Sequence, residues 1–291
     1  VLTLSLFTAC GPDFADSGEA IVDAEEAMEM VGQDGVVWVD AQGANLYKME
    51  HAEGAVNITR GDITVGEPYP NMGAPKSQVE DVFSKAGISN DSTVLIYDTN
   101  KHMDAARLWW TLAAYGHPKE KLKVISGGLS ALARAGANLG NDKVSVSETD
   151  YSASDFDESM LAELEEVKKQ VNNPSDDVVI VDTRTLKERY EGTIPGSVHI
   201  NFTENNFSDG TYRPVDQIRI RYLEDEITPD KTVITFCKSS IRAAQTYVAL
   251  YNAGYRNLKI YDGAWLEWSN TSGLPVQKPE EGAQPAPTMQ D

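Results

Sequence analysis

Apolar and polar positions along this chain follow two different periods. Short runs of Val, Ile, Leu and aromatic residues are typical of buried strands, and longer segments with an apolar residue every three or four positions are typical of helices. We predict strands at 36–40, 55–58, 94–98, 124–125, 178–182 and 233–236, and helices at 21–31, 79–86, 105–115, 129–134 and 161–171. Strands that alternate with helices at this spacing predict an α/β fold with a mainly parallel sheet.

The second half of the chain repeats the first. Residues 36–40 correspond to 178–182 and, at the same offset, residues 54–58 correspond to 196–200. Further matching pairs follow in the same order, namely 94–98 with 233–237, 105–106 with 243–244, and 126–129 with 262–265. Because such an ordered series is not expected by chance, the 291 residues are predicted to form a tandem of two homologous α/β domains.

Composition marks the expected domain boundaries. We place a first domain at 20–140 and a second at 159–275, joined by a linker at 141–158 that is rich in Asp, Ser and Glu. Residues 1–19 are expected to be a signal remnant followed by a tether. Residues 276–291 contain Pro, Gln and Glu without periodicity, so we expect a disordered tail.

Acidic residues dominate the charge of the chain. Lys plus Arg number 25 against 45 for Asp plus Glu, which gives a formal net charge of −20. Such a surface repels nucleic acid and anionic membranes, so neither is an expected partner.

The first nine residues are apolar or small, and Cys10 and Gly11 follow. This order resembles the end of a bacterial lipoprotein signal, whose cleavage leaves a lipid-bearing cysteine, here Cys10. The resemblance implies an extracytoplasmic protein of the periplasm or cell envelope, held to the membrane only through that lipid. The alternative is an apolar terminus without a function.

A second cysteine stands at a strand-to-helix turn. The apolar run 233–236 ends at Cys237, a short polar loop follows, and helical periodicity begins at Ala243. Unpaired backbone N–H groups at such a turn, together with Lys238 and Arg242, favour a thiolate, the nucleophilic form of cysteine. The alternative is a buried cysteine of the core.

The order strand, Cys237, four residues, Arg242 and helix resembles the active-site loop of rhodanese-type sulfurtransferases. The resemblance extends over about residues 20–275 and includes further motifs: Asp182-Thr183-Arg184, Ile194 to Ile200, Ser126-Gly127-Gly128, Asp262 to Trp265, and Ala106 to Trp110. It implies a tandem of two rhodanese-like domains, each a mainly parallel sheet flanked by helices.

The resemblance also implies a chemistry. Cys237 would carry a sulfane sulfur as a persulfide, cradled by loop amides assigned to Lys238, Ser239, Ser240, Ile241 and Arg242. A small anionic donor would supply the sulfur, and a thiol or cyanide would accept it. No metal and no organic cofactor are needed.

The two halves differ where the chemistry is expected. Domain one has Asp98 at the place of Cys237, so we expect it to be non-catalytic. The first half has no arginine at the positions that correspond to Arg184 and Arg189. The family resemblance implies that these two arginines bind the anionic donor. For Arg184, a salt bridge with Asp182 is an equal alternative.

Two features bear on the choice of donor. Lys238, a basic residue after the cysteine, is similar to thiosulfate-type members, whereas Ser239 matches the serine of mercaptopyruvate-type members. In the latter, a histidine at the position of His51 would pair with that serine; alternatively, His51 is a surface or packing residue. Thiosulfate or a similar donor is our first prediction, and 3-mercaptopyruvate is the alternative.

Two other functions are open. The chain could be a sulfur carrier or binding lipoprotein that passes its sulfur once to a dedicated partner. It could also be a phosphatase or arsenate reductase, but related phosphatases place five residues between Cys and Arg and usually a His before the Cys, where this chain has Phe236.

Overall fold

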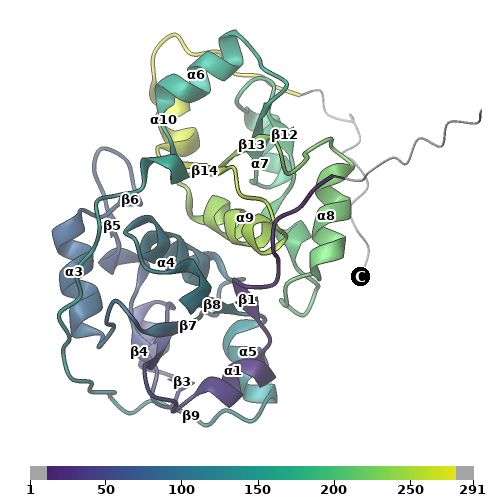
Figure 1. Cartoon of the computed structure of the whole chain (residues 1–291). Coiled ribbons are helices and arrows are strands. Elements are labelled where there is room, and N and C mark those ends of the chain that lie inside the picture. Colours follow the sequence, from purple (N-terminus) through teal and green to yellow (C-terminus); the bar gives the residue numbers. More distant parts are fainter. Residues whose placement is uncertain (1–11, 280–291) are drawn as a thin grey trace, which may run out of the picture.

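The computed structural model describes residues 12–279, which form two α/β domains built on separate sheets (Figure 1). The first sheet has five parallel strands in the order β1 (Ile21–Val22), β8 (Leu122–Ile125), β7 (Thr93–Tyr97), β2 (Val36–Asp40) and β4 (Val56–Asn57). Its helices are α1 (Ala24–Met30), α2 (Ala44–Tyr47), α3 (Lys76–Lys85), α4 (Met103–Ala114) and α5 (Gly128–Arg134).

The second sheet repeats this topology. Its five parallel strands are β10 (Leu161–Ala162), β14 (Leu258–Tyr261), β13 (Thr232–Phe236), β11 (Val178–Asp182) and β12 (Val198–His199). Its helices are α6 (Leu164–Asn172), α7 (Leu186–Glu191), α8 (Val215–Leu223), α9 (Ile241–Asn252) and α10 (Ala264–Asn270). The predicted tandem of two homologous domains, each with a mainly parallel sheet, is confirmed.

Smaller elements of both domains and of the linker lie outside the two main sheets. A two-stranded antiparallel sheet pairs β3 (His51–Ala52) with β9 (Leu139–Gly140), and an antiparallel hairpin pairs β5 (Thr64–Val65) with β6 (Met72–Gly73). Single turns of 3-10 helix lie at Arg60–Asp62, Lys119–Lys121, Glu158–Met160 and Phe202–Asn205.

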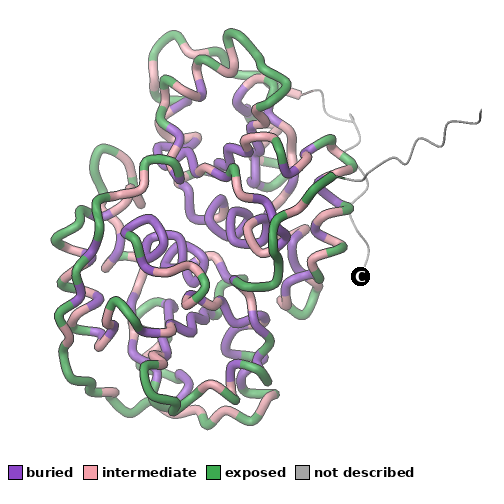
Figure 2. Tube along the Cα trace, viewed as in Figure 1, coloured by how far each residue is buried: buried purple, intermediate pink, exposed green. Residues whose placement is uncertain are grey.

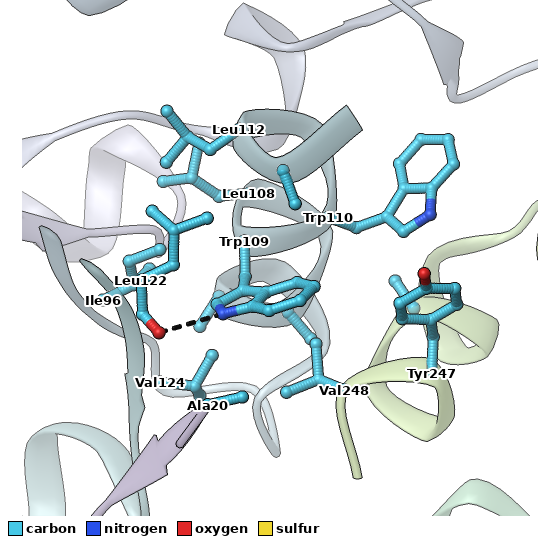
Figure 3. Close-up of a cluster of buried hydrophobic side chains, with 14 of the residues drawn as sticks. Ala20, Ile96, Leu108, Trp109, Trp110, Leu112, Leu122, Val124, Tyr247 and Val248 are labelled. Carbon is cyan, nitrogen blue, oxygen red and sulfur yellow. Dashed lines mark hydrogen bonds between the residues drawn. The ribbon is translucent and has the colours of Figure 1, made fainter. Parts of the chain in front are cut away.

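Helices α4 and α9 pack against each other between the two sheets (Figure 1), and both are buried along their length (Figure 2). Figure 3 shows Trp109 of α4 between strand residues of its own domain and Tyr247 and Val248 of α9. The indole nitrogen of Trp109 donates a hydrogen bond to the carbonyl of Leu122 (3.1 Å). One continuous apolar core therefore spans both domains and fixes the two loops that precede these helices.

Two predicted helices begin later than expected, for the same reason. Residues 21–22 and 161–162 form short strands at the sheet edges, paired with β8 and β14, before α1 and α6 begin. A strand of two residues is too short to show the alternation of apolar and polar residues that marks a strand. The sequence pattern therefore assigns its apolar residues to the following helix.

The segments outside the two sheets are attached to them. In the expected tether, the amides of Ala15 and Gly18 donate to the carbonyls of Gly254 (3.1 Å) and Asn252 (2.9 Å) of domain two. In the expected tail, Gln277 pairs with Thr193 through two backbone hydrogen bonds of 2.8 and 3.0 Å. The rest of the predicted tail, from residue 280 on, and Cys10 lie outside the described residues. Within 12–279, none of the helices has the length and apolar composition to cross a membrane.

Candidate active site

Cys237 lies at the carboxyl end of β13, the central strand of the second sheet. The chain then turns through Ser240, which has a left-handed backbone (φ 63°), and enters α9 at Ile241. The carbonyl oxygens of Cys237 and Lys238 accept hydrogen bonds from the amides of Trp265 (3.0 Å) and Leu266 (3.2 Å) at the start of α10. Cys237 is only 1% exposed and belongs to the apolar core that spans both domains.

Arg242 stands in the first turn of α9 and is held by an acid that the sequence did not single out. Its guanidinium donates two hydrogen bonds to Glu188 of α7, at 2.6 and 2.8 Å. Burial alone would raise the pKa of Glu188, but hydrogen bonds from Arg242 and Thr185 lower it to about 2. Burial opposes the charge of Arg242, yet its pKa is raised by Glu188 and Cys237. Glu188 therefore keeps Arg242 charged and oriented beside Cys237.

The three loop residues between Cys237 and Ile241 have different surroundings. Lys238 is exposed, Ser239 is half-buried and Ser240 is buried. The hydroxyl of Ser240 donates to the carbonyl of Ser239 (2.8 Å). The side chain of Ile241 is buried in the core. Only the backbone of this residue is therefore available to contact a substrate.

Arg184 is a buried residue of the core of domain two. Its Nε and Nη2 donate to the carboxylate of Asp182 at 2.9 and 2.6 Å, and Nη2 also donates to the carbonyl of Gly192 (2.7 Å). The guanidinium lies 4.5 Å from the ring centroid of Trp265. These contacts favour the salt-bridge alternative over donor binding.

Arg189 is half-buried on α7. Its Nη2 donates to the carbonyl of Ser197 (3.0 Å). Burial lowers the pKa of Arg189, and the charge of Arg184 adds to this effect. Its role in donor binding remains a prediction.

His51 does not meet Ser239. It is 1% exposed, its Nδ1 donates to the carbonyl of Tyr47 (2.8 Å), and its ring stacks on that of Tyr47 with centroids 3.8 Å apart. The hydroxyl of Ser239 instead accepts a hydrogen bond from Asn71 (2.8 Å). These contacts favour the packing alternative for His51.

The corresponding loop of domain one shows what this backbone can hold. The carboxylate of Asp98 accepts four backbone hydrogen bonds of 2.8–2.9 Å from Asn100, His102, Asp104 and Ala105. His102, like Ser240, is the left-handed residue before its helix, with the same φ of 63°. Burial raises the pKa of Asp98 to about 6, although the amide hydrogen bonds oppose the rise.

The equivalent cradle in domain two is not filled by its own side chain. By their places relative to the helix, Ser240, Arg242 and Ala243 correspond to His102, Asp104 and Ala105. Within residues 12–279, the backbone amides of these three residues donate to no acceptor. A helix start leaves such N–H groups directed at an incoming anion. The start of α9 therefore presents unpaired N–H groups of the kind that can bind an anion.

The family of rhodanese-like domains matches residues 23–135 and 163–271. A protein of Haloferax volcanii named "Putative thiosulfate sulfurtransferase" is 29% identical over 248 residues, which cover 80% of this chain and 85% of that protein. The sulfur carrier protein TtuD of Thermus thermophilus is 28% identical over 254 residues, covering 81% and 88%.

A solved structure has the same fold. The crystal structure of SseA from Escherichia coli, described as a 3-mercaptopyruvate sulfotransferase, superposes with a TM-score of 0.75 at 23% identity, covering 84% of this chain and 98% of SseA. With two matched domains that each keep the sheet order and the strand–loop–helix turn, the chain belongs to the rhodanese family of sulfurtransferases.

Proposed function

We propose that this chain moves a sulfane sulfur from a small anionic donor to a thiophilic acceptor through a persulfide on Cys237. The observation that carries the proposal is the pair of equivalent loops. The carboxylate oxygens of Asp98 lie two bonds beyond Cβ and accept four backbone amides. The outer sulfur of a cysteine persulfide also lies two bonds beyond Cβ, so the corresponding amides at the start of α9 would hold it as an anion at Cys237, although the loop after Cys237 is one residue shorter.

Each half of the cycle breaks one sulfur–sulfur bond as a new bond to the transferred sulfur forms. The Cys237 thiolate attacks the outer sulfur of thiosulfate, the new bond forms, and the old bond's electron pair leaves with sulfite. The negative charge then resides on the outer sulfur of the persulfide, where preorganised loop amides and Arg242 stabilise it. An acceptor such as cyanide attacks that sulfur, and the electron pair returns to Cys237 as thiocyanate leaves.

Thiosulfate or a similar anion is the proposed donor because Lys238 is exposed beside the loop. 3-Mercaptopyruvate is the alternative, since the loop carries Ser239. The contact expected to support it, between His51 and Ser239, is not formed: His51 is buried against Tyr47, and the serine hydroxyl accepts from Asn71.

A sulfur carrier is the second candidate function. Cys237 is 1% exposed, which would shield a bound sulfur from water, and the Thermus thermophilus relative is itself named a sulfur carrier protein. Multiple turnovers with thiosulfate and cyanide would exclude a carrier that releases its sulfur only to a dedicated partner.

Intact-mass spectrometry tests the shared step. We expect the purified chain to gain the mass of one sulfur atom after incubation with thiosulfate or 3-mercaptopyruvate, and to lose it on adding cyanide. Cys237→Ser, which keeps Cys10, is the matched control and should gain nothing. A wild-type chain that stays unmodified with both donors would overturn the proposal.

Attachment to the cell envelope through a lipid on Cys10 remains a separate proposal. Expression from the native gene in a bacterium supplied with labelled fatty acid should label the wild-type protein and not a Cys10→Ala variant. Equal labelling of the two, or none, would contradict it.

A further inference from the structure

Side chains from domain one complete the loop that carries Cys237. The side-chain amide nitrogen of Asn71, just before β6, donates to the hydroxyl of Ser239 (2.8 Å). Arg107 of α4 donates through Nη1 to the hydroxyl of Ser240 (3.1 Å). The two serines that shape the loop are thus each held by a residue from the other domain.

Arg107 also ties this contact to the rest of the interface. Its side chain is fully buried, and Nη1 donates to Asp262 of domain two (2.8 Å) while Nη2 donates to the carbonyl of Asn71 (3.1 Å). The amide of Gly73 donates to the other oxygen of Asp262 (2.8 Å). One guanidinium therefore fixes the hairpin of domain one, the closing motif of domain two and the loop after Cys237 together.

We propose that Arg107 and Asn71 are positioning residues for sulfur transfer, which makes domain one an obligatory part of the site. The proposal rests on the function proposed above and specifies how that site is assembled. Ser240 has the left-handed conformation that His102 has in domain one, where the amides of His102, Asp104 and Ala105 donate to the carboxylate of Asp98. A left-handed serine is disfavoured on its own, so the conformation depends on external contacts.

The other loop offers an internal control with the same construction. There the side chain of Asn206, from domain two, hydrogen-bonds Nδ1 of His102 (3.0 Å). Gln245 occupies the place in α9 that Arg107 has in α4 and donates to Asn206 (2.5 Å). Each domain thus braces the other's loop, but only one of the two loops carries the cysteine.

The test compares Asn71→Gly with Asn206→Ala in the full-length chain. Glycine is chosen because Asn71 has a positive φ of 69°, which alanine disfavours. We expect Asn71→Gly to lower the maximal rate of persulfide formation about three- to tenfold, as for one lost hydrogen bond, with little change in the donor KM. Asn206→Ala should stay within about twofold of wild type although it also removes a contact between the domains.

Two further variants sharpen the result. Combining Asn71→Gly with Ser239→Ala should cost no more than the larger single change, because both remove the same hydrogen bond. Arg107→Lys keeps the charge but not the planar fork, so it should lower the maximal rate about tenfold or more. If Arg107→Lys does not fold, Asn71→Gly, alone and combined with Ser239→Ala, still tests the proposal.

Equal losses in Asn71→Gly and Asn206→Ala would overturn the proposal, because both would then reflect only a loosened interface. Fully additive losses in the double variant would also overturn it. A wild-type chain that forms no persulfide refutes the proposed function itself, whereas a loaded wild type with unaffected Asn71 and Arg107 variants refutes only the positioning roles.

Discussion

The two loops at the centre of the molecule both enter their helix through a left-handed residue, His102 or Ser240, and differ in charge. After β7, the loop carries an acid, Asp98, and the first turn of α4 carries Asp104, which pairs with Arg60 (2.7 Å). After β13, the loop carries Cys237, and the first turn of α9 carries Arg242, which pairs with Glu188 (2.6 Å). The second residue of the helix is thus an acid, Asp104, in domain one and a base, Arg242, in domain two.

This reversal shows how one fold separates a structural loop from a reactive one. In domain one the acid is part of the chain, is buried, and accepts hydrogen bonds from four amides. Domain two lacks this acid, and the guanidinium of Arg242 stands beside the place where the persulfide anion would form. We infer that domain one has kept the cradle for stability, while domain two uses it for chemistry.

The largest expected effect comes from the cysteine. Cys237→Ser should reduce sulfur transfer to the background rate while leaving the fold intact, because the hydroxyl is similar in size and the nucleophile alone is lost. Steady-state cyanide assays and circular dichroism would measure both properties. Turnover near that of the wild type would refute a persulfide on this residue.

The cation of the reactive loop should come next. Arg242→Met removes the charge beside the outer sulfur and leaves Glu188 without its partner. We expect transfer to fall by roughly a hundredfold, or about 3 kcal/mol, as for other groups that stabilise developing charge. Stopped-flow measurement of persulfide formation would test this. A change of less than threefold would mean that the loop amides suffice without Arg242.

Asp98→Ala should lower the stability of the protein much more than its rate of sulfur transfer. It leaves backbone amides buried without an acceptor, so the free energy of unfolding should fall by at least about 2 kcal/mol. Transfer by the folded protein should stay within a few-fold, since Asp98 has no covalent role. Urea unfolding and cyanide assays below the transition would be compared. Loss of transfer in a folded variant would show that the two loops are coupled.

The titration of Asp98 provides a finer test. Its pKa is raised from 3.8 to about 6 by burial, so between these values the folded state binds more protons than the unfolded state. Stability should therefore fall as the pH rises from about 4 to about 6, by on the order of 2 kcal/mol. Asp98→Asn is the matched control, because it keeps the shape and does not titrate.

Asp40 has a similarly raised pKa of about 6, chiefly because it is buried, and the charge of Asp98 contributes to the rise. The difference between the two proteins therefore reports the titration of Asp98 together with its coupling to Asp40. Urea midpoints for wild type and Asp98→Asn across this range would measure the effect. Parallel pH profiles for the two proteins would contradict it.

Much of the fold could be read from the sequence because its buried strands are nearly uniform in hydrophobicity. The runs at 36–40 and 178–182 became β2 and β11 without a shift of boundary. The edge strands β1 and β10 were missed because two residues carry no period. The repeat predicted the tandem, but not that α4 and α9 share one core.

The site was predictable only where its residues are consecutive. The loop from Cys237 to Arg242 follows from a strand that ends at a cysteine. No sequence pattern placed Glu188 in the site, although Thr185 and Glu188 do form the capping box that opens α7. The contacts of Asn71 and Arg107 link residues 168 and 133 positions apart, and no local pattern encodes them.

The smallest expected effect is that of Lys238, and it bears on the choice of donor. Lys238 is the exposed member of the reactive loop, and the chain around it carries a net charge of −20. Thiosulfate is a dianion, so a nearby ammonium offsets the repulsion locally. Mercaptopyruvate carries one carboxylate and should depend on Lys238 less.

Lys238→Ala should therefore raise KM for thiosulfate several-fold, equivalent to about 1 kcal/mol, and KM for 3-mercaptopyruvate less. The difference should shrink at high salt, because exposed charges are screened over a short Debye length. Lys238→Arg, which keeps the charge, should behave like the wild type. Equal effects on the two donors, or an effect that ignores salt, would mean that Lys238 does not set the donor preference, and the case for thiosulfate over mercaptopyruvate would lose its support in this loop.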